Sequence, residues 1–375
     1  MRTLFITSFG PARGSGSGER SQSIVNALAR FGDVELMLLK LPGMQMGPHD
    51  GDYFFEPFAG YGPWGWRRHH LTLQAFRPRR DLTEALDRIT RDRHFDLFFC
   101  RFDVGIMTGC WRKGPSMIDL DGIPTDQRVT GNLPGLGAAR RVAMDRVLRN
   151  YRTVFVTKAA DVPKIHHPTI EVLPCVSTSV APYDGDPPPG PPRVLFVGSM
   201  GVPWNRTALE RFVAGSWPAI RARVPDAELR VVGGAQELVP RAEGVRPLGF
   251  VDDLEAEYRA ATVVASVVRA GNGANVKMAE AARAGRPIVA TTYSAGGYTG
   301  ILEPGRDMLV AESDAEVADA CVRVITDRAL ARGLAASVAR TADAKLSQAA
   351  IDAIIARHVA TLDRPAATPA TAAAG

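Results

Sequence analysis

Short apolar runs rich in β-branched and aromatic residues alternate with helical segments along the whole chain, which predicts an α/β protein built on parallel sheets. In the first half, buried strands are predicted at 2–9, 34–39, 95–102, 116–121, 153–157 and 170–174, and helices at 21–30, 81–93 and 137–152. The opening order of strand, glycine-bearing loop, helix and strand is the unit from which doubly wound sheets are made.

The second half repeats this order after a run of prolines. Strands are predicted at 193–197, 228–234, 245–251, 261–268 and 287–291, and helices at 205–214, 275–284, 314–326, 329–339 and 349–362. We therefore predict two Rossmann-like domains facing each other across a cleft, at 1–185 and 193–345, joined by a proline-rich linker at 186–192. A C-terminal helix at 346–362, with the first domain as its candidate packing partner, precedes a disordered tail at 363–375.

The segment 261–284 carries the strongest chemical signal. A buried-strand pattern at 261–268 leads into a glycine-bearing loop and then a helix from about Asn275. Free N–H groups and the positive end of the helix dipole favour an anion there, most often a phosphate. Lys277 adds a cation in the first turn, and Glu280 lies three residues further on the same side. This arrangement suits a ligand with phosphate and sugar hydroxyls, and an ordinary strand–helix turn with solvated charges is the alternative.

Composition narrows the class of protein. The net charge of +5 over 375 residues is too small for a dedicated nucleic-acid binder unless the charge is concentrated. The four cysteines form no Cys-x-x-Cys pair, so neither structural zinc nor a disulfide framework is expected. No apolar run approaches the ~20 residues that span a bilayer, and the N-terminus has the pattern of a strand, so we expect a cytoplasmic protein.

Two features of the first half have open interpretations. Asp119 and Asp121 lie near the carboxyl end of a predicted strand, where they would contact substrate hydroxyls or cap the following turn, with a metal site as the minority view. The segment 64–80 holds five arginines, several aromatics and no acid. It is a solvated loop, an anionic membrane surface or a site for single-stranded nucleic acid, and nothing else in the chain supports the last.

The second half resembles the donor domain of glycosyltransferase family 4, which comprises retaining enzymes of the GT-B fold. The similarity is carried by ordered blocks between 194 and 310: 194–200 with Pro203 and Asn205, 231–233, 248–254, 271–287 and 304–310. The first half is similar to the acceptor domain more loosely, through 14–20 and 119–121. Asn272 stands where the family usually has the first of two glutamates, and Glu280 matches the second.

The resemblance implies roles for individual residues. Lys277 and Arg206 would neutralise the diphosphate of the donor, and Glu280 would hold ribose hydroxyls. The remaining donor-binding positions are Gly198, Asn205, Phe250, Val251, Gly271, Asn272, Gly273, Ala274 and Asn275, with the Phe250–Val251 backbone meeting the base. In the first domain, Gly16, Gly18, Arg20, Asp119 and Asp121 would form the acceptor and phosphate loop.

The function that follows from the resemblance is transfer of a sugar, with retention, from a nucleotide-diphosphate sugar to a hydroxyl of a glycan or lipid-linked acceptor, in polysaccharide or glycoconjugate synthesis. No metal and no cofactor beyond the co-substrate are implied. Segment 64–80 would place the protein peripherally on the inner face of the membrane. A sugar-nucleotide epimerase and a catalytically silent nucleotide-sugar-binding protein are the alternatives, whereas a dehydrogenase would need a complete dinucleotide fingerprint, which 14–20 lacks.

Overall fold

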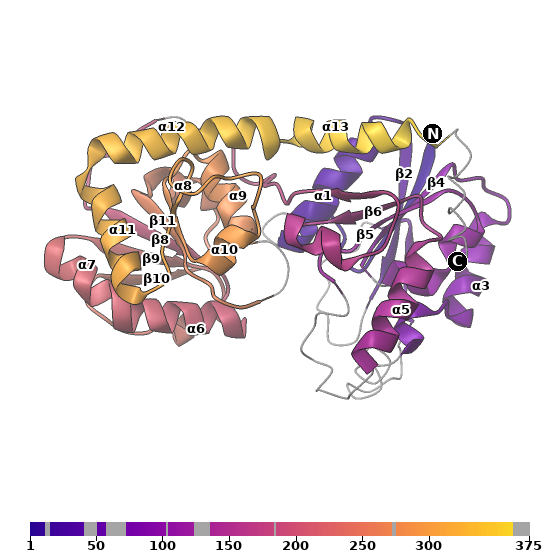
Figure 1. The fold of residues 1–375 in the computed structure, drawn as a ribbon, viewed down its shortest axis with the longest axis horizontal. Coiled ribbons are helices and arrows are strands. Elements are labelled where there is room, and N and C mark those ends of the chain that lie inside the picture. The colour runs from indigo at the N-terminus through magenta and orange to yellow at the C-terminus, as the bar shows by residue number, and fades with distance from the viewer. Residues whose placement is uncertain are drawn as a thin grey trace, which may run out of the picture. The chain divides into compact units, whose positions relative to one another are not determined.

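The computed structural model describes residues 1–11, 16–40, 51–57, 73–102, 104–123, 136–183, 185–271 and 275–362. Expectations for Asn272, Gly273 and Ala274, for residues 64–72 of the basic segment and for the tail 363–375 lie outside these ranges. The chain divides into two compact units (Figure 1). The first comprises 1–157, 161–173 and the residues from 351 onward, and the second comprises 158–160 and 174–350.

Seven parallel strands form the sheet of the first unit within its described residues, in the order β3-β2-β1-β4-β5-β6-β7. The strands are β1 (Arg2–Thr7), β2 (Asp33–Leu39), β3 (Tyr53–Phe55), β4 (Leu97–Arg101), β5 (Ser116–Asp119), β6 (Thr153–Val156) and β7 (Ile170–Val172). The helices are α1 (Gly16–Ala29), α3 (Arg80–Thr90), α4 (Val104–Thr108) and α5 (Leu136–Leu148), with short 3-10 turns η1 (Leu73–Phe76), η2 (Cys110–Arg112) and η4 (Ala159–Lys164).

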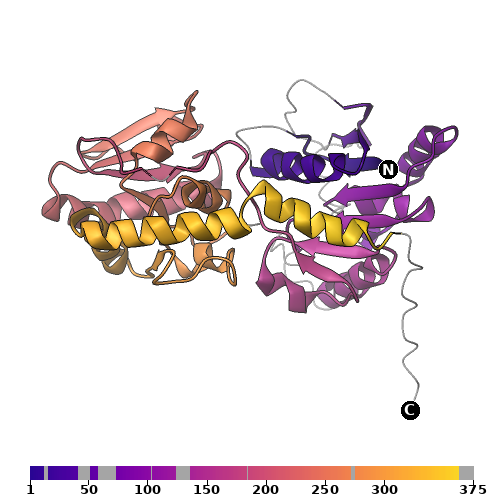
Figure 2. The ribbon, with the colours of Figure 1, turned by 90° about the horizontal axis from the view of Figure 1, so that it is seen from above.

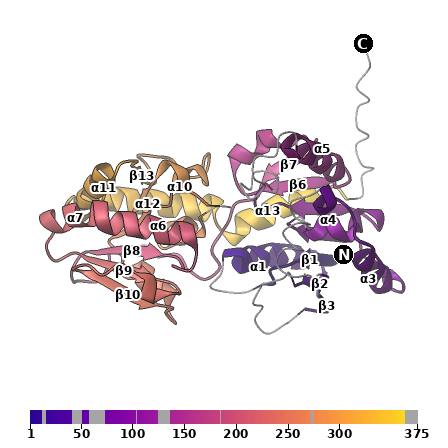
Figure 3. The same ribbon diagram turned by 90° about the horizontal axis from the view of Figure 1, so that it is seen from below.

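Helices cover both faces of this sheet because its strands are apolar on both sides (Figure 3). Leu4 and Ile6 pack with buried residues of α3, α4 and α5 on one face. On the other face Phe5, Phe99 and Phe155 form a row of stacked rings with centroids 5.7 and 5.9 Å apart. His358 of α13 (Gln348–Val359) meets the edge of the Phe155 ring at 5.0 Å, which docks the C-terminal helix on the first unit.

The second unit holds six parallel strands among its described residues, in the order β10-β9-β8-β11-β12-β13. Figure 2 shows the ribbon of this unit from above, in colours that run from pink to yellow. The strands are β8 (Arg193–Val197), β9 (Glu228–Val232), β10 (Val245–Gly249), β11 (Val263–Ser266), β12 (Ile288–Ala290) and β13 (Leu309–Val310). The helices are α6 (Pro203–Arg211), η5 (Phe212–Ser216, a π turn), α7 (Trp217–Arg223), η6 (Gln236–Leu238, a 3-10 turn), α8 (Leu254–Ala260), α9 (Val276–Arg283), α10 (Thr292–Gly296), α11 (Asp314–Thr326) and α12 (Arg328–Lys345). The predicted pair of doubly wound, Rossmann-like domains is confirmed.

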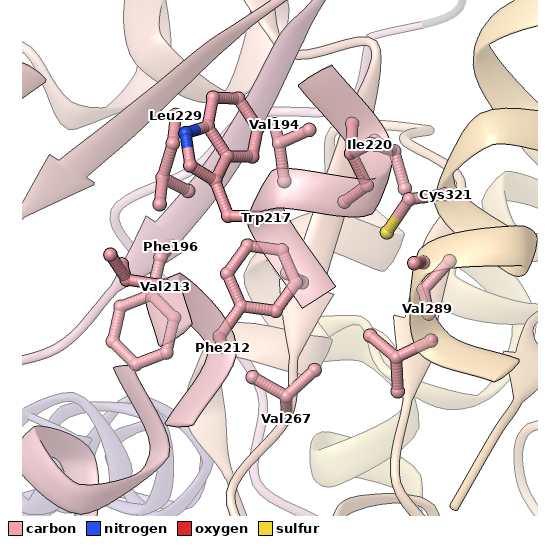
Figure 4. Packing of buried hydrophobic residues seen from close by; sticks show 14 of the residues in the cluster. Val194, Phe196, Phe212, Val213, Trp217, Ile220, Leu229, Val267, Val289 and Cys321 are labelled. Atoms are coloured by element: carbon pink, nitrogen blue, oxygen red, sulfur yellow. The ribbon is translucent and has the colours of Figure 1, made fainter. Parts of the chain in front are cut away.

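A large apolar cluster fixes one face of the second sheet (Figure 4). Trp217, buried between strands and helices, packs beside Phe212 and donates its indole N–H to the carbonyl oxygen of Glu243 at 2.8 Å. Val267 and Cys321 close the cluster on the side of β11 and α11. The cysteine acts here as a small buried apolar side chain.

The change from the first unit to the second falls at Pro174, earlier than the predicted end of the first domain at 185. The reason is Tyr183, whose ring lies 5.3 and 5.0 Å from the guanidinium carbons of Arg259 and Arg286. Asp186 pairs with Arg332 at 2.7 Å, so the proline-rich stretch 186–192 also belongs to the second unit. The segment was predicted to be a linker between the domains because it is rich in proline, but its aromatic and charged contacts attach it to the second unit.

Two helices differ from their predicted bounds. α1 begins at Gly16, where the sequence predicted a loop to Gly18 and a helix from 21. The carbonyl oxygen of Ser17, in its first turn, accepts a hydrogen bond from Arg101 at 2.7 Å, a contact from a distant strand that stabilises the early start. The helix predicted at 205–214 begins at Pro203, since proline is favoured in a first turn, and continues through the π turn into α7.

Candidate functional site

The candidate site of the second unit lies where β11 leads into α9. β11 is buried and pairs with β8 and β12, so its carboxyl end opens near the middle of the sheet edge. Asn275 precedes α9, but its side chain donates to Ser294 Oγ at 3.1 Å and makes no capping bond to the helix. Among the described residues the Asn275 side chain thus does not cap α9, which makes the N–H groups of its first turn candidates to bind an anion.

Lys277 is the buried cation of this site, with 9% of its surface exposed. Its Nζ donates to Asn205 Oδ1 at 3.2 Å and lies 5.1 Å from the centroid of the Phe196 ring. Burial lowers the pKa of Lys277 from 10.5 to about 8, although Glu280 raises it in part. Within the described ranges no carboxylate comes within ion-pair distance of this ammonium, so its near partners are a neutral amide and an aromatic face.

Glu280 lies one turn after Lys277 and is also buried, with 7% of its surface exposed. Its Oε2 accepts a hydrogen bond from the hydroxyl of Tyr258 on α8 at 2.5 Å. The same hydroxyl lies 3.4 Å from the carbonyl oxygen of Lys277. One tyrosine thus contacts both residues that the sequence placed at the centre of the donor site.

Three strand ends meet beside this helix through glycines. The N–H of Gly198 donates to the carbonyl oxygen of Val232, and the N–H of Gly233 to that of Gly249, both at 2.8 Å. Gly198 and Gly233 have φ angles of 154° and 136°, and a Cβ on Gly233 would lie 2.3 Å from the Gly198 carbonyl oxygen. A side chain at 233 would separate the two loops, and one at 198 would meet the side chain of Asn205, so this close approach requires glycine at both positions. The loops at 198 and 233 are thus held against each other by their backbones.

Other predicted donor residues have surroundings of their own. Arg206 is partly exposed and its Nε lies 4.0 Å from Glu210 Oε1, whereas its neighbour Asn205 contacts the lysine. Phe250 is 82% exposed, and its ring lies against Gly234. Val251 and Gly271 are partly buried, and the carbonyl oxygen of Gly271 accepts from Tyr293 at 2.5 Å. These donor-binding roles stay predictions.

The predicted acceptor residues of the first unit form a buried ion network. Asp119, fully buried at the end of β5, accepts two hydrogen bonds from Arg20, at 2.8 and 2.6 Å, and one from Arg101 at 3.0 Å. Arg101 also donates to the carbonyl oxygen of Ser17 and to Ser21 Oγ. Burial opposes ionisation of Asp119, but the two arginines outweigh it and hold the pKa of this carboxyl below its usual range. The network anchors the N-terminal turns of α1 to the sheet.

Asp121 lies at the edge of this network, with 15% of its side chain exposed. Its Oδ2 accepts from Arg101 at 3.0 Å. Asp121 and Phe102 follow neighbouring strands and have positive φ angles of 51° and 59°, a strained conformation that is found at functional sites. Gly16 and Gly18 lie in the first turn of α1. Of the predicted acceptor residues, Asp121 is thus more accessible than Arg20 or Asp119, which are paired with each other.

Two residues of these sites were missed by the sequence analysis. Arg101 ends β4 and Asp119 ends β5, and these two strands are parallel neighbours. Had this pairing been predicted, the two side chains would have been expected to lie together. Tyr258 is one of a few polar groups on α8, and nothing in its local sequence distinguishes a buried hydroxyl from an exposed one. Both contacts join residues far apart in the chain.

Fold and site together define a class: a protein of two Rossmann-like domains with a buried lysine at a helix N-terminus, the GT-B type of architecture. Residues 191–327 match the family model described as "Glycosyl transferases group 1". The match contains β8 to α11 and every predicted donor residue, so the similarity to group 1 glycosyl transferases covers the donor half of the chain. The resemblance predicted from the sequence is confirmed.

Solved structures share the fold over all or part of the chain. A sucrose-phosphate synthase from Thermosynechococcus elongatus is 18% identical, with a TM-score of 0.69 over 96% of this chain and 99% of that one. HepE from Anabaena, in complex with UDP and glucose, is 14% identical, with a TM-score of 0.68 over 96% and 99%. TarM from S. aureus, with UDP among its ligands, is 14% identical, with a TM-score of 0.54 over 76% and 58%. No curated protein matches the chain.

Membrane-spanning helices and metal clusters are both absent from the described residues. No helix there has the length and apolar character of a membrane span. No group of three or more His, Cys, Asp and Glu side chains in those ranges is arranged to hold a metal ion.

Proposed function

We propose that the protein transfers a sugar, with retention of configuration, from a nucleotide-diphosphate sugar to a hydroxyl of a glycan or lipid-linked acceptor. The observation that carries the proposal is Lys277, a buried ammonium at the uncapped start of α9 whose near partners are neutral. A buried cation is costly unless an anion compensates it. A diphosphate at the start of α9 would supply that anion and would also accept from the free N–H groups of the helix.

The reaction needs negative charge to be stabilised on the leaving group. As the bond between the anomeric carbon and the phosphate oxygen breaks, charge grows on the nucleoside diphosphate, and Lys277 and the first turn of α9 would stabilise that charge. The acceptor oxygen bonds to the anomeric carbon, and its proton passes to the departing phosphate. Glu280 would hold ribose hydroxyls, and Asn205 orients the ammonium of Lys277.

In the first unit, Asp121 is the proposed contact for an acceptor hydroxyl. Its carboxylate is partly accessible and is held by Arg101, so it can accept a further hydrogen bond without moving. Asp119 is assigned a structural role because its two oxygens already receive Arg20 and Arg101. Orientation of the acceptor would supply a large part of the rate, as in other bimolecular reactions made unimolecular by binding.

The complexes of proteins with a related fold suggest which donor to test first. HepE is described in complex with UDP-glucose, and TarM with UDP and α-GlcNAc-glycerol. Uridine-diphosphate sugars are therefore the first donors to offer this protein, followed by guanosine and thymidine analogues.

The experiment is a transfer assay on Lys277→Ala. Removing the cation should lower transfer by about a hundredfold to a thousandfold, the usual cost of losing one preorganised donor at a developing charge. Lys345→Ala is the matched control, because Lys345 is exposed on α12 and donates to the carbonyl oxygen of Gly300. Full activity of Lys277→Ala, with the control also active, would refute the donor assignment.

The same assay separates the alternatives. Interconversion of the sugar nucleotide without transfer would indicate an epimerase, and nucleotide binding without either reaction would indicate a silent binding protein. Turnover that survives a chelator such as EDTA is the expected result for a mechanism in which Lys277 supplies the cation, and loss of turnover would contradict metal independence.

Peripheral binding to an anionic membrane and a lipid-linked acceptor form the last part of the proposal, motivated by the acid-free composition of 64–80. We expect activity on a lipid-linked acceptor to rise with anionic liposomes and to fall with added salt. Equal activity with neutral and anionic liposomes would contradict the membrane role and leave the donor assignment intact.

A further inference from the structure

The contact between Tyr258 and Glu280 joins two helices of the second unit, α8 and α9 (Figure 1). The tyrosine is fully buried, and its hydroxyl lies 2.5 Å from Glu280 Oε2 and 3.4 Å from the carbonyl oxygen of Lys277. A hydroxyl has one proton to donate, and the shorter contact to a charged acceptor is the stronger bond. Tyr258 therefore donates its hydroxyl proton to the carboxylate of Glu280.

Tyr258 is itself held in place by the rest of α8. The side chain of Asp253 caps the helix by accepting from the N–H of Ala256 at 2.9 Å. Glu257, the residue before Tyr258, forms a bidentate ion pair with Arg230 of β9 at 2.7 and 2.6 Å. These contacts fix the rotation of α8 against the sheet, so the hydroxyl of Tyr258 is delivered to a defined position.

A glutamate has several rotatable bonds, and its carboxylate recognises a diol only when those rotations are restrained. The bond from Tyr258 restrains Glu280 at one oxygen. An ionised carboxylate offers roughly four lone-pair sites, so one tyrosine bond is compatible with a further donor from a ligand. Such a pre-oriented acceptor favours a ligand that brings a hydroxyl and disfavours one that lacks it.

We propose that Tyr258 is a positioning residue that orients Glu280 toward the ribose of the donor nucleotide, and that the preference for ribose over deoxyribose depends on its hydroxyl. This inference rests on the proposed function, because it takes Glu280 to face the ribose. It adds that recognition of the ribose depends on Tyr258 of α8, a residue that acts through Glu280 and does not touch the ligand.

The test is the affinity of wild-type and Tyr258→Phe protein for UDP and for its 2′-deoxy and 3′-deoxy analogues, measured by calorimetry. Wild type should prefer UDP to at least one deoxy analogue. Tyr258→Phe should lower the affinity for UDP by about tenfold. It should leave the affinity for that analogue nearly unchanged, because a ligand without the hydroxyl does not use the orientation of Glu280. With a UDP-sugar donor, KM should rise more than kcat falls.

Tyr183→Phe is the matched control, because this tyrosine of the same unit donates its hydroxyl to the carbonyl oxygen of Asp186 at 3.1 Å, on an exposed segment. It should bind all three nucleotides like wild type. Glu280→Gln gives a second route: it should reduce the preference for UDP by itself, and adding Tyr258→Phe should bring no further loss.

The outcomes are distinct. Equal weakening of UDP and both deoxy analogues by Tyr258→Phe would show a merely structural role and overturn the inference, as would an unchanged preference in that variant. Independent, additive losses from the two substitutions would overturn it as well. Wild-type protein that binds none of the three nucleotides would instead refute the donor assignment on which the inference rests.

Discussion

The two units bury charge at equivalent places, a carboxyl strand end beside the first turns of a helix, but they compensate it differently. In the first unit, Asp119 receives three hydrogen bonds from Arg20 and Arg101. In the second unit, Lys277 donates to the neutral amide oxygen of Asn205. Glu280, three residues further along the helix, accepts a hydrogen bond from Tyr258, and no ion pair joins Glu280 to Lys277 in the described structure.

On the proposed function, this difference separates a charge that serves the fold from one that would bind a ligand. A buried ion pair with complete hydrogen bonding gains little in net stability, yet losing one partner is costly because the other is left uncompensated. A buried cation with neutral partners has the opposite character, since it costs stability until an anion arrives. The first arrangement is complete within the protein, whereas the proposed function has a diphosphate complete the second.

The largest expected effect is on stability in the first unit. Asp119→Ala removes the carboxylate that two buried guanidinium groups share, of which Arg101 keeps Asp121 as a partner and Arg20 loses its two close bonds. The change should lower the free energy of unfolding by about 3–5 kcal/mol. Asp87→Ala, which breaks the exposed pair with Lys113, is the control and should cost about 0–1 kcal/mol. Chemical denaturation followed by circular dichroism measures both. Equal, small losses would show that the Asp119 network is not a buried structural pair.

A smaller effect of opposite sign is expected in the second unit. Lys277→Met keeps the apolar stem and removes a buried charge whose pKa is lowered from 10.5 to about 8. At neutral pH the variant should gain at most about 3 kcal/mol of stability, because lowering a pKa by one corresponds to about 1.4 kcal/mol. In the wild type, the cost in stability of burying the charged lysine is complete below pH 8 and disappears as pH rises to 10.5. The stability gained by Lys277→Met should therefore vanish over that range. A large loss of stability at neutral pH would contradict the account.

The smallest effect is the pH dependence of nucleotide affinity. The ammonium form of Lys277 is the binding form, and its pKa of about 8 in the free protein makes affinity fall as pH rises through that value. Between about pH 7 and pH 9 the affinity for UDP should fall by about tenfold. The fall should be absent in Lys277→Arg, whose guanidinium stays charged. A flat profile for wild type would place the binding cation elsewhere.

Most of the fold could be predicted from the sequence because parallel strands buried on both faces are nearly continuous apolar runs. β8, β11 and α9 fall within two or three residues of their predicted positions. β3 was missed, since its three residues form a strand only by pairing with β2. The early change of unit at Pro174 depends on Arg259 and Arg286 around Tyr183, a contact between distant residues that no local pattern contains.

The candidate site could be predicted in part. Local spacing placed Lys277 and Glu280 on one side of a helix start, and both lie there. Spacing could not show that Lys277 is buried, that Asn205 rather than Arg206 contacts it, or that Tyr258 contacts Glu280, because these facts arise from packing between α6, α8 and α9. For the same reason Arg20 and Asp119 were predicted as ligand contacts and are found paired with each other.

The central claim is that Lys277 and the first turn of α9 capture a diphosphate, and calorimetry of nucleoside diphosphates tests it most directly. We predict that wild-type protein binds at least one of UDP, GDP and TDP at neutral pH, and that Lys277→Ala binds the same nucleotide at least about tenfold more weakly. Wild-type protein that binds none of the three, or a variant with unchanged affinity, would contradict the account.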